Sequence, residues 1–296
     1  MSGEKVGFVG LGAMGLPMAV NLARKQFRVA GFDLRAEALA ALEAEGGTRA
    51  ASAAEAAKGA DILVLMVVNA AQAEAVLFGA KAAEALPKGA TVVLMATAAP
   101  AQVEAIAARL AAMGLDFVDA PVSGGTKGAA GASLTIMAAA PAATMAKARP
   151  VLEALGDKLF HVGEKPGQGA AVKTVNQLLC GVHIAALAEA MAMAEKAGLD
   201  GALMLKILGG SAASSWMLHD RGPRMLEAEP VVSSAVDIFV KDLGIVLDAG
   251  RSSKLALPLS AAAHQMFLAA SGMGLGGKDD SHVVEAYRVL AGRPQV

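Results

Sequence analysis

The sequence predicts an α/β fold, in which a Rossmann-type doubly wound parallel sheet is followed by an all-α C-terminal domain. In the first half of the chain, short apolar or β-branched runs alternate with alanine-rich helical stretches, as expected where helices cover a parallel sheet. Strands cease after the loop Gly163–Gly169, and helical periodicity continues from there. The 296 residues suffice for two domains, which we place at residues 1–164 and 165–296.

The predicted sheet is built from short runs separated by helical intervals. Two of the helices have clear starts, since Ala13–Lys25 follows a glycine turn and Ala101–Met113 follows Pro100, a residue suited to a first helical turn. The predicted strands are Val6–Val9, Arg28–Phe32, Ile62–Val67, Thr91–Met95, Asp116–Val118, Leu134–Met137 and Leu159–His161.

A long helix is predicted to open the second domain and to form a spine between the two domains. The stretch Gly169–Gly198 contains no proline, and its apolar residues lie nearly all round, which is typical of a helix buried on several sides. Polar residues such as His183 and Glu189 argue against a membrane span. The remaining predicted helices are Gly201–Leu208, Ser234–Arg251, Leu259–Ala270 and Ser281–Ala291.

Composition excludes several classes of function. A formal net charge of −1 offers no basic surface to a nucleic acid, so we expect no nucleic-acid partner. The single cysteine, Cys180, cannot form an internal disulfide, and no export signal is visible at Met1–Lys5, so we expect a cytoplasmic protein. The five histidines lack the spacing of metal ligands, and we expect no metal site.

A glycine-rich turn predicts a dinucleotide site. The segment GLGAMG follows the first strand directly and precedes a helix, which is the context that the dinucleotide fingerprint needs. Its first glycine permits a tight turn, its second admits the pyrophosphate, and its third lets the helix pack against the strand. The helix N-terminus then presents N–H groups to the phosphates. The predicted cofactor-binding residues here are Gly10, Leu11, Gly12, Ala13, Met14 and Gly15.

An acidic residue after the second strand favours NAD over NADP. Asp33 lies about 20 residues beyond the turn, where a carboxylate accepts hydrogen bonds from the adenosine ribose and repels a 2′-phosphate. Arg35 lies two residues further and is expected to soften that preference. A glycine turn without any ligand is the alternative, and the combination of strand, turn, helix and acid argues against it.

A polar patch on the long helix marks a second site. Lys173 is followed three and four positions later by Asn176 and Gln177, so the three side chains share one face. Desolvation of such a lysine favours its neutral form, which accepts a proton, and the amides are suited to positioning a substrate. The alternative is that Lys173, in the first turn, simply reaches solvent, and position alone does not decide between the two.

Four motifs in order resemble the β-hydroxyacid dehydrogenase family, the group that includes 3-hydroxyisobutyrate dehydrogenases. They are GFVGLGAMG (Gly7–Gly15), DAPVSGG (Asp119–Gly125), GQGAAVKTVNQ (Gly167–Gln177) and FVKDL (Phe239–Leu243), and together they span nearly the whole chain. The resemblance implies a nicotinamide-dependent dehydrogenase of small hydroxy acids.

The resemblance also implies a role for individual residues. Lys173 takes the part of the catalytic acid/base, and the turn Ser123, Gly124 and Gly125 holds the substrate, consistent with backbone N–H groups that approach a carboxylate. Asn176 and Gln177 complete the substrate side. Thr97 and Lys241 are assigned to the cofactor, and Asp242 orients the region around Lys241.

One departure from the family pattern points to a branch. Many members carry asparagine four residues beyond the lysine, whereas this chain has Gln177 there and Asn176 one position earlier. This variant, with the segments GVHIAALAEAMA, SSWM, SAVDIFVKDLG and GKDDS, resembles the L-threonate dehydrogenase branch. The expected substrate is therefore a four-carbon sugar acid such as L-threonate, oxidised with NAD.

Other functions remain open from the sequence. Within the family, the alternatives are a 3-hydroxyisobutyrate dehydrogenase and a 2-hydroxy-3-oxopropionate (tartronate semialdehyde) reductase. Outside the enzymes, the alternative is a silent cofactor-binding module, which the presence of Lys173 disfavours. The abundance of apolar C-terminal helices predicts a homodimer or homotetramer.

Overall fold

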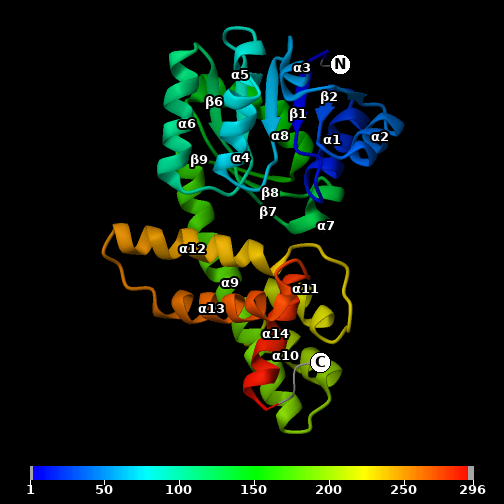
Figure 1. Ribbon diagram of the computed structural model, residues 1–296, viewed down its shortest axis with the longest axis vertical. Helices are drawn as coiled ribbons and strands as arrows, with labels where there is room; N and C mark the ends of the chain where they lie inside the picture. Colours follow the sequence, from blue (N-terminus) through cyan, green and yellow to red (C-terminus); the bar gives the residue numbers. More distant parts are fainter. Residues whose placement is uncertain (1–2, 293–296) are drawn as a thin grey trace. The chain divides into compact units, whose positions relative to one another are not determined.

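The computed structural model describes residues 3–292 and contains two compact units, Met1–Lys173 and Thr174–Val296 (Figure 1). Helix α9 (Gln168–Lys196) begins in the first unit and continues into the second. The predicted class, a Rossmann-type sheet followed by a helical C-terminal region that starts with a long helix, is confirmed.

Unit 1 is built on one nine-stranded sheet with the order β3-β2-β1-β4-β5-β6-β8-β7, and β9 pairs with β8. From β3 to β6 all neighbours are parallel, with β1 at the point where the strand order reverses. The strands are β1 (Lys5–Val9), β2 (Arg28–Phe32), β3 (Thr48–Arg49), β4 (Ile62–Leu65), β5 (Thr91–Leu94), β6 (Asp116–Asp119), β7 (Val122–Ser123), β8 (Thr135–Ala139) and β9 (Lys158–Gly163).

The central strands are apolar throughout because helices bury both of their faces. In β4, Ile62 and Val64 belong to one core cluster, and Leu63 and Leu65 belong to the other. Alternate residues of a strand point to opposite faces, so each strand feeds two cores.

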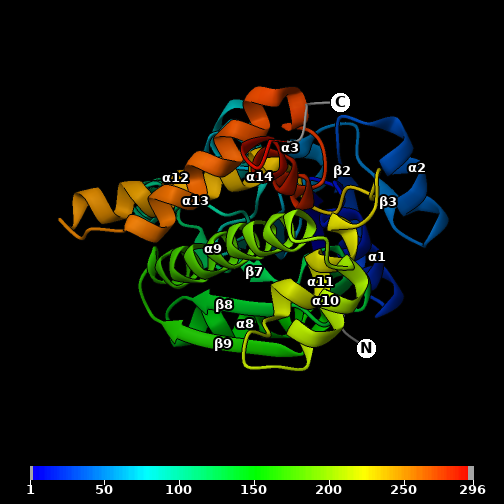
Figure 2. The ribbon, with the colours of Figure 1, turned by 90° about the horizontal axis from the view of Figure 1, so that it is seen from below.

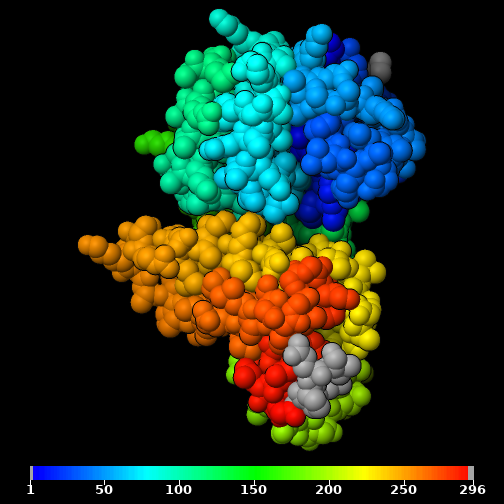
Figure 3. All heavy atoms as spheres, in the orientation of Figure 1, coloured from blue at the N-terminus to red at the C-terminus, as the bar shows by residue number. Residues whose placement is uncertain are grey.

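One face of the sheet packs on α1 (Gly15–Arg24), α2 (Ala36–Ala44), α7 (Gly125–Ala130) and α8 (Ala142–Leu155). The other face packs on α3 (Ala53–Ala57), α4 (Ala70–Glu74), the π-helix η1 (Ala75–Gly79), α5 (Ala82–Ala85) and α6 (Pro100–Ala112). The atoms of α4, α5 and α6 lie on the face of unit 1 that is turned to the viewer in Figure 3.

The far edge of the sheet departs from the predicted parallel arrangement. Strand β8 runs antiparallel to both β6 and β7, and β9 is again parallel to β8. Only Ala120 and Pro121 separate β6 from β7, and both strands are antiparallel to β8, so β6 and β7 run in the same direction. The chain then passes through α7 and returns as β8 in the opposite direction.

In the described part of unit 2, helices joined by loops make up the regular structure, apart from an isolated β-bridge between Ala235 and Asp279. Besides α9 it contains α10 (Gly201–Gly209), α11 (Trp216–Met225), α12 (Val236–Ser252), α13 (Pro258–Ala270), the π-helix η2 (Ser271–Leu275), the 3-10 turn η3 (Asp280–His282) and α14 (Val283–Leu290). Helices α12 and α13 lie side by side (Figure 2). Between them, Phe239 stacks on Phe267 with ring centroids 5.1 Å apart.

Helix α9 has the length and composition of a membrane span, with a mean hydropathy of 1.5 over its most apolar stretch. Half of that stretch is buried inside the structure, as in the core helix of a soluble protein.

Helix α11 is absent from the sequence-based prediction. It contains Gly222 and Pro223 in succession, a pair that usually ends a helix. Ion pairs hold it instead: the Arg221 guanidinium donates to both carboxylate oxygens of Asp280 at 2.8 Å, and Arg224 donates to Asp279 at 2.9 Å. Tertiary contacts of this kind override local propensity.

Candidate active site

The glycine turn of unit 1 is shaped by close approaches of backbone atoms. Gly10 has φ +94°, and a Cβ atom there would lie 2.5 Å from the carbonyl oxygen of Met66. At Gly15 a Cβ would lie 1.8 Å from the carbonyl oxygen of Gly10, so only glycine lets α1 start this close to β1. A Cβ at Gly12, by contrast, would meet nothing within 4 Å.

These features fit a dinucleotide. The open side of Gly12 leaves room for a pyrophosphate to approach the backbone, as the second glycine of the fingerprint requires. Helix α1 begins at Gly15 with no side-chain hydrogen bond from its N-cap residue, Met14, and with no acidic residue in its first turn. Its N-terminal N–H groups and the positive end of its dipole therefore suit a bound anion.

The carboxylate of Asp33 closes the turn from the end of β2. Its Oδ2 accepts the backbone N–H of Leu11 at 2.7 Å, and its Oδ1 accepts both the backbone N–H and the Nε of Arg35 at 3.0 Å. The Arg35 guanidinium also donates to the carbonyl oxygen of Leu11 at 2.7 Å. Burial alone would raise the pKa of Asp33, but the hydrogen bonds from Arg35 and Leu11 outweigh it and lower that pKa.

The predicted substrate turn lies at the antiparallel edge of the same unit. Ser123 ends β7 and pairs with Thr135 of β8, while Gly124 (φ +126°) and Gly125 (φ +60°) turn the chain into α7. A Cβ at Gly125 would meet nothing within 4 Å, so the backbone of the turn is open to a ligand on that side. Ser123, Gly124 and Gly125 are all half-buried.

Asn21 ties this turn to the helix of the glycine turn. From α1, its Nδ2 donates to the carbonyl oxygens of Ala129, at 2.8 Å, and Ala130, at 3.3 Å, which end helix α7. Asn21 is not predictable from the sequence, because nothing in its local pattern marks a contact 108 residues away.

The start of α9 is held by Asp119, the last residue of β6. Its Oδ2 accepts the backbone N–H groups of Gly167, at 3.0 Å, and Ala170, at 2.9 Å. The side chain is buried, with 1% exposure, and this burial raises the pKa of Asp119 to about 6 against the opposing effect of the backbone N–H donors. Asp119 is the first residue of the motif DAPVSGG, but the motif by itself does not indicate that this carboxylate caps α9.

Lys173 lies one turn further along α9 and is the last residue of unit 1. Its side chain is 6% exposed. The alternative that this lysine simply reaches solvent is therefore wrong, because a solvated lysine would be mostly exposed. Thr97, also in unit 1, follows β5 and is half-buried.

In unit 2, the predicted amides join Lys241 and Asp242 in one hydrogen-bonded chain. Asn176 Nδ2 donates to Gln177 Oε1 at 3.0 Å, and Gln177 Nε2 donates to the buried Asp242 Oδ2 at 2.5 Å. Lys241 Nζ donates to Asp242 Oδ1 at 2.6 Å. Asn176 Nδ2 also donates to Cys180 Sγ at 3.3 Å. The structure thus brings Lys241 together with the amides of α9.

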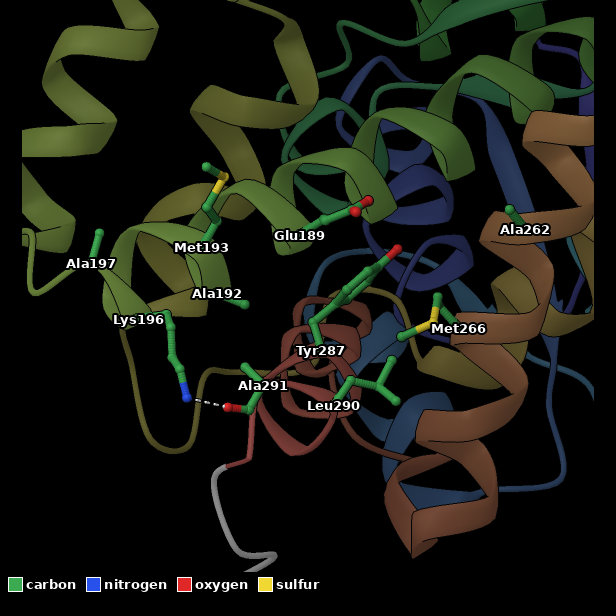
Figure 4. A pocket seen from close by; sticks show the side chains of 10 residues that line it. All are labelled: Glu189, Ala192, Met193, Lys196, Ala197, Ala262, Met266, Tyr287, Leu290 and Ala291. Carbon is green, nitrogen blue, oxygen red and sulfur yellow. Dashed lines mark hydrogen bonds between the residues drawn. The ribbon is translucent and has the colours of Figure 1, made fainter.

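A separate open groove of about 750 Å³ lies within unit 2 (Figure 4). Its lining is mostly apolar, and the Lys196 amine donates to the carbonyl oxygen of Ala291 at 2.7 Å. None of the predicted site residues lines it. Within residues 3–292, no group of three or more His, Cys, Asp or Glu side chains is arranged to hold a metal ion.

Comparison with protein families gives two matches along the chain. Residues 5–163 match the NAD-binding domain of 6-phosphogluconate dehydrogenase. Residues 167–287 match the NAD-binding domain of NADP-dependent 3-hydroxyisobutyrate dehydrogenase.

Individual relatives cover nearly the whole chain. The chain is 48% identical to L-threonate dehydrogenase of Cupriavidus necator over 285 residues, 96% of each protein. It is 42% identical to L-threonate dehydrogenase of Escherichia coli K12 over 284 residues, 95% of this chain and 94% of the relative. Among solved structures, a 3-hydroxyisobutyrate dehydrogenase from Salmonella typhimurium matches with a TM-score of 0.90 and 42% identity, covering 95% of this chain and 98% of that one.

Proposed function

This chain belongs to the β-hydroxyacid dehydrogenase family, in the branch of the L-threonate dehydrogenases, and from this premise we propose that it oxidises L-threonate with NAD, using Lys173 as acid/base. That it is an oxidoreductase acting on a CH–OH group with a nicotinamide cofactor follows from the family. The substrate, the choice of NAD and the residue roles are the proposal.

The proposal of L-threonate as the substrate rests on the 48% identity with an L-threonate dehydrogenase over 96% of both chains. The pair Asn176 and Gln177 on α9, which resembles the pattern of this branch, supports the same substrate. Since Gln177 is bonded at its nitrogen to Asp242 and at its oxygen to Asn176, we assign it to holding Asn176 in place on the substrate side.

The chemistry of the chain's own residues is proton transfer and substrate binding. A bound nicotinamide supplies the hydride acceptor for the carbinol carbon. The neutral Lys173 amine accepts the hydroxyl proton, and its positive charge then stabilises the oxygen; in the opposite direction it returns the proton. Ser123 and the N–H groups of Gly124 and Gly125 bind the substrate carboxylate, whose charge suits a turn with open backbone.

The choice of NAD over NADP rests on Asp33, the residue that follows β2. Asp33 keeps its negative charge at neutral pH, since its pKa is lowered, and a carboxylate beside the adenosine ribose accepts hydroxyl hydrogen bonds and disfavours a 2′-phosphate. In this proposal residues Gly10–Gly15 hold the pyrophosphate, and Thr97 and Lys241 contact the cofactor on its nicotinamide side.

The test is an absorbance assay of NAD reduction by the purified enzyme. L-threonate, D-threonate, 3-hydroxyisobutyrate, D-glycerate and L-serine are compared by kcat/KM, each with NAD and with NADP. We expect the largest value for L-threonate with NAD. A larger value for 3-hydroxyisobutyrate contradicts the proposed substrate, as does a larger kcat/KM for tartronate semialdehyde in the reverse assay, which follows NADH oxidation. Turnover with NADP alone contradicts the role of Asp33.

The role of Lys173 is tested by Lys173→Ala. We expect kcat to fall by about 10²- to 10⁴-fold, the usual worth of a general acid/base, while NAD still binds in calorimetric titration. Lys147→Ala is the matched control, since this lysine is exposed in the same unit and pairs with Asp116. A Lys173→Ala enzyme that keeps its turnover contradicts the acid/base assignment, and loss of NAD binding points to a damaged fold.

A further inference from the structure

The start of α9 is fastened to the sheet by a single buried carboxylate. Asp119 Oδ2 accepts two N–H groups of the first turn, at 3.0 Å from Gly167 and 2.9 Å from Ala170. N–H groups in the first turn of a helix have no partner inside the helix, so a side chain that accepts them fixes where the helix begins. Here that side chain comes from 48 residues earlier in the sequence.

Steric contact locks the same turn against two strands. A Cβ at Gly169 would lie 2.6 Å from the carbonyl oxygen of Met137 in β8 and 2.7 Å from that of Asp119 in β6. The helix backbone therefore rests directly on the end of β6 and on the middle of β8, and only glycine permits this approach. The carboxylate and the glycine together leave the first turn of α9 little freedom to shift.

The segment that follows Asp119 leads directly to the proposed substrate turn. Only Ala120 and Pro121 separate Asp119 from β7, and Ser123 follows as the last residue of β7. Backbone hydrogen bonds hold both residues between β6 and β7. The Ala120 N–H donates to the carbonyl oxygen of Leu94 at 2.8 Å, and the carbonyl oxygen of Pro121 accepts the N–H of Met137 at 3.0 Å. Asp119 thus connects the base of α9 to the segment that leads to Ser123.

We propose that Asp119 is a positioning residue for the reaction, because its carboxylate sets the first turn of α9, and with it Lys173, at a defined place relative to the Ser123 turn. This inference rests on the assignment of Lys173 as the acid/base. Lys173 lies three residues after Ala170 on a continuous helix, so a displacement of the first turn moves it too. Misplacing a reacting group by about 1 Å can cost about a hundredfold in rate.

The experiment compares Asp119→Ala with Asp119→Asn, using whichever hydroxy acid the wild-type enzyme oxidises fastest. The alanine variant removes the acceptor, and we expect kcat to fall by about tenfold to a hundredfold with little change in NAD affinity. The asparagine variant keeps an amide oxygen that accepts the same N–H groups, and we expect it to recover most of the rate. Amide hydrogen exchange over residues 164–172 reports the first turn directly and should rise in Asp119→Ala.

Asp200→Ala is the matched control. Asp200 caps α10 by accepting the N–H of Leu203 at 2.7 Å, so this variant also removes a capping carboxylate. We expect it to lower the melting temperature while leaving kcat and KM unchanged. If Asp119→Ala does not fold, Asp119→Ser replaces it, since the hydroxyl is polar but reaches less far toward the helix.

Each outcome decides the inference. It is overturned if exchange rises in Asp119→Ala without a loss of kcat, because the carboxylate is then only a structural cap. It is also overturned if Asp119→Asn is as slow as Asp119→Ala, because the charge and not the position then matters. If Lys173→Ala keeps its turnover, the assignment of Lys173 as acid/base fails. That failure is distinguishable from failure of the Asp119 proposal, because the two are measured in different variants.

Discussion

The glycine turn and the start of α9 are two regions of unit 1 that are built in the same way. In each, a carboxylate at the end of a strand accepts backbone N–H groups: Asp33, after β2, accepts Leu11, and Asp119, at the end of β6, accepts Gly167 and Ala170. In each, a helix closes on the sheet at a glycine, Gly15 or Gly169, where a side chain would clash with backbone oxygens.

The two carboxylates differ in their hydrogen-bond partners and in the direction of their pKa shifts. Arg35 pairs with Asp33 at 3.0 Å, and the pKa of Asp33 is lowered although burial alone would raise it. The hydrogen-bond partners of Asp119 are backbone N–H groups, and burial raises its pKa to about 6 in spite of them. Backbone donors favour the charged carboxylate in both regions, but the hydrogen bonds outweigh the effect of burial only at Asp33, where Arg35 adds to them.

The largest predicted effect concerns the two glycines. A Cβ would lie 1.8 Å from the Gly10 oxygen at Gly15, and 2.6 Å from the Met137 oxygen at Gly169, so we expect each alanine variant to lose about 3 kcal/mol or more of stability. Functionally they should separate: Gly15→Ala weakens NAD binding, whereas Gly169→Ala lowers kcat and largely keeps NAD affinity. Chemical denaturation, calorimetric titration and steady-state kinetics measure these effects.

Gly79→Ala is the control for this pair, because a Cβ there meets nothing within 4 Å and Gly79 has no positive φ. Its stability should change by less than about 1 kcal/mol. If Gly15→Ala and Gly169→Ala impair NAD binding equally, the two regions do not have separate tasks and the comparison fails.

The second prediction concerns pH, where the raised pKa of Asp119 makes its ionisation costly to the fold. The folded state binds this proton up to about pH 6, whereas an unfolded chain releases it near 3.8. The stabilisation is therefore complete below pH 3.8 and is lost as the pH rises through 6, and about two pKa units correspond to about 3 kcal/mol. Asp119→Asn does not titrate and should gain up to this amount relative to wild type between pH 4 and 7.

Urea denaturation of both proteins at a series of pH values measures this difference, and the other carboxylates cancel because both proteins carry them. If the difference in unfolding free energy between the two proteins does not change with pH, the pKa of Asp119 is not raised in the folded state and the prediction is wrong. Asp33→Asn is the informative counterpart, since the pKa of Asp33 is lowered: its loss of stability relative to wild type should be complete above the unfolded pKa of Asp33 and should shrink as the pH falls below that value.

The same two regions explain what the sequence could and could not predict. Gly10–Gly15 and Asp33 are predictable because the turn, the helix start and the acid follow each other at the spacing of a known fingerprint. The contact between Asp119 and Gly167 joins residues 48 apart and depends on how β6 and α9 pack, so no local pattern encodes it. The family motifs place Lys173, Asn176 and Lys241 in order along the chain, but the bond from Gln177 to Asp242 emerges only from the packing of α9 on α12.

Similar reasoning applies to the fold. Strands buried on both faces, such as β4 and β5, are evident from their apolar runs. The two-residue strands β3 and β7 and the antiparallel course of β8 are not, because they are too short for periodicity and depend on pairing with distant segments. Helix α11 was missed because its ion pairs with Asp279 and Asp280 lie outside its own sequence.

The smallest predicted effect tests whether Arg35 screens the charge of Asp33 toward the cofactor. Arg35 is half-exposed, so its removal in Arg35→Ala should be worth about 1 kcal/mol or less, which raises the preference for NAD over NADP in kcat/KM by up to about fivefold. The physical reason is that the unscreened carboxylate repels a 2′-phosphate more strongly. Asp33→Asn should move the ratio in the opposite direction, and Arg24→Ala, which breaks the exposed pair with Glu45 in the same unit, should leave it unchanged. A fall of the ratio in Arg35→Ala would mean that Arg35 helps to bind NAD itself, and the selectivity assigned to Asp33 would then belong to the pair.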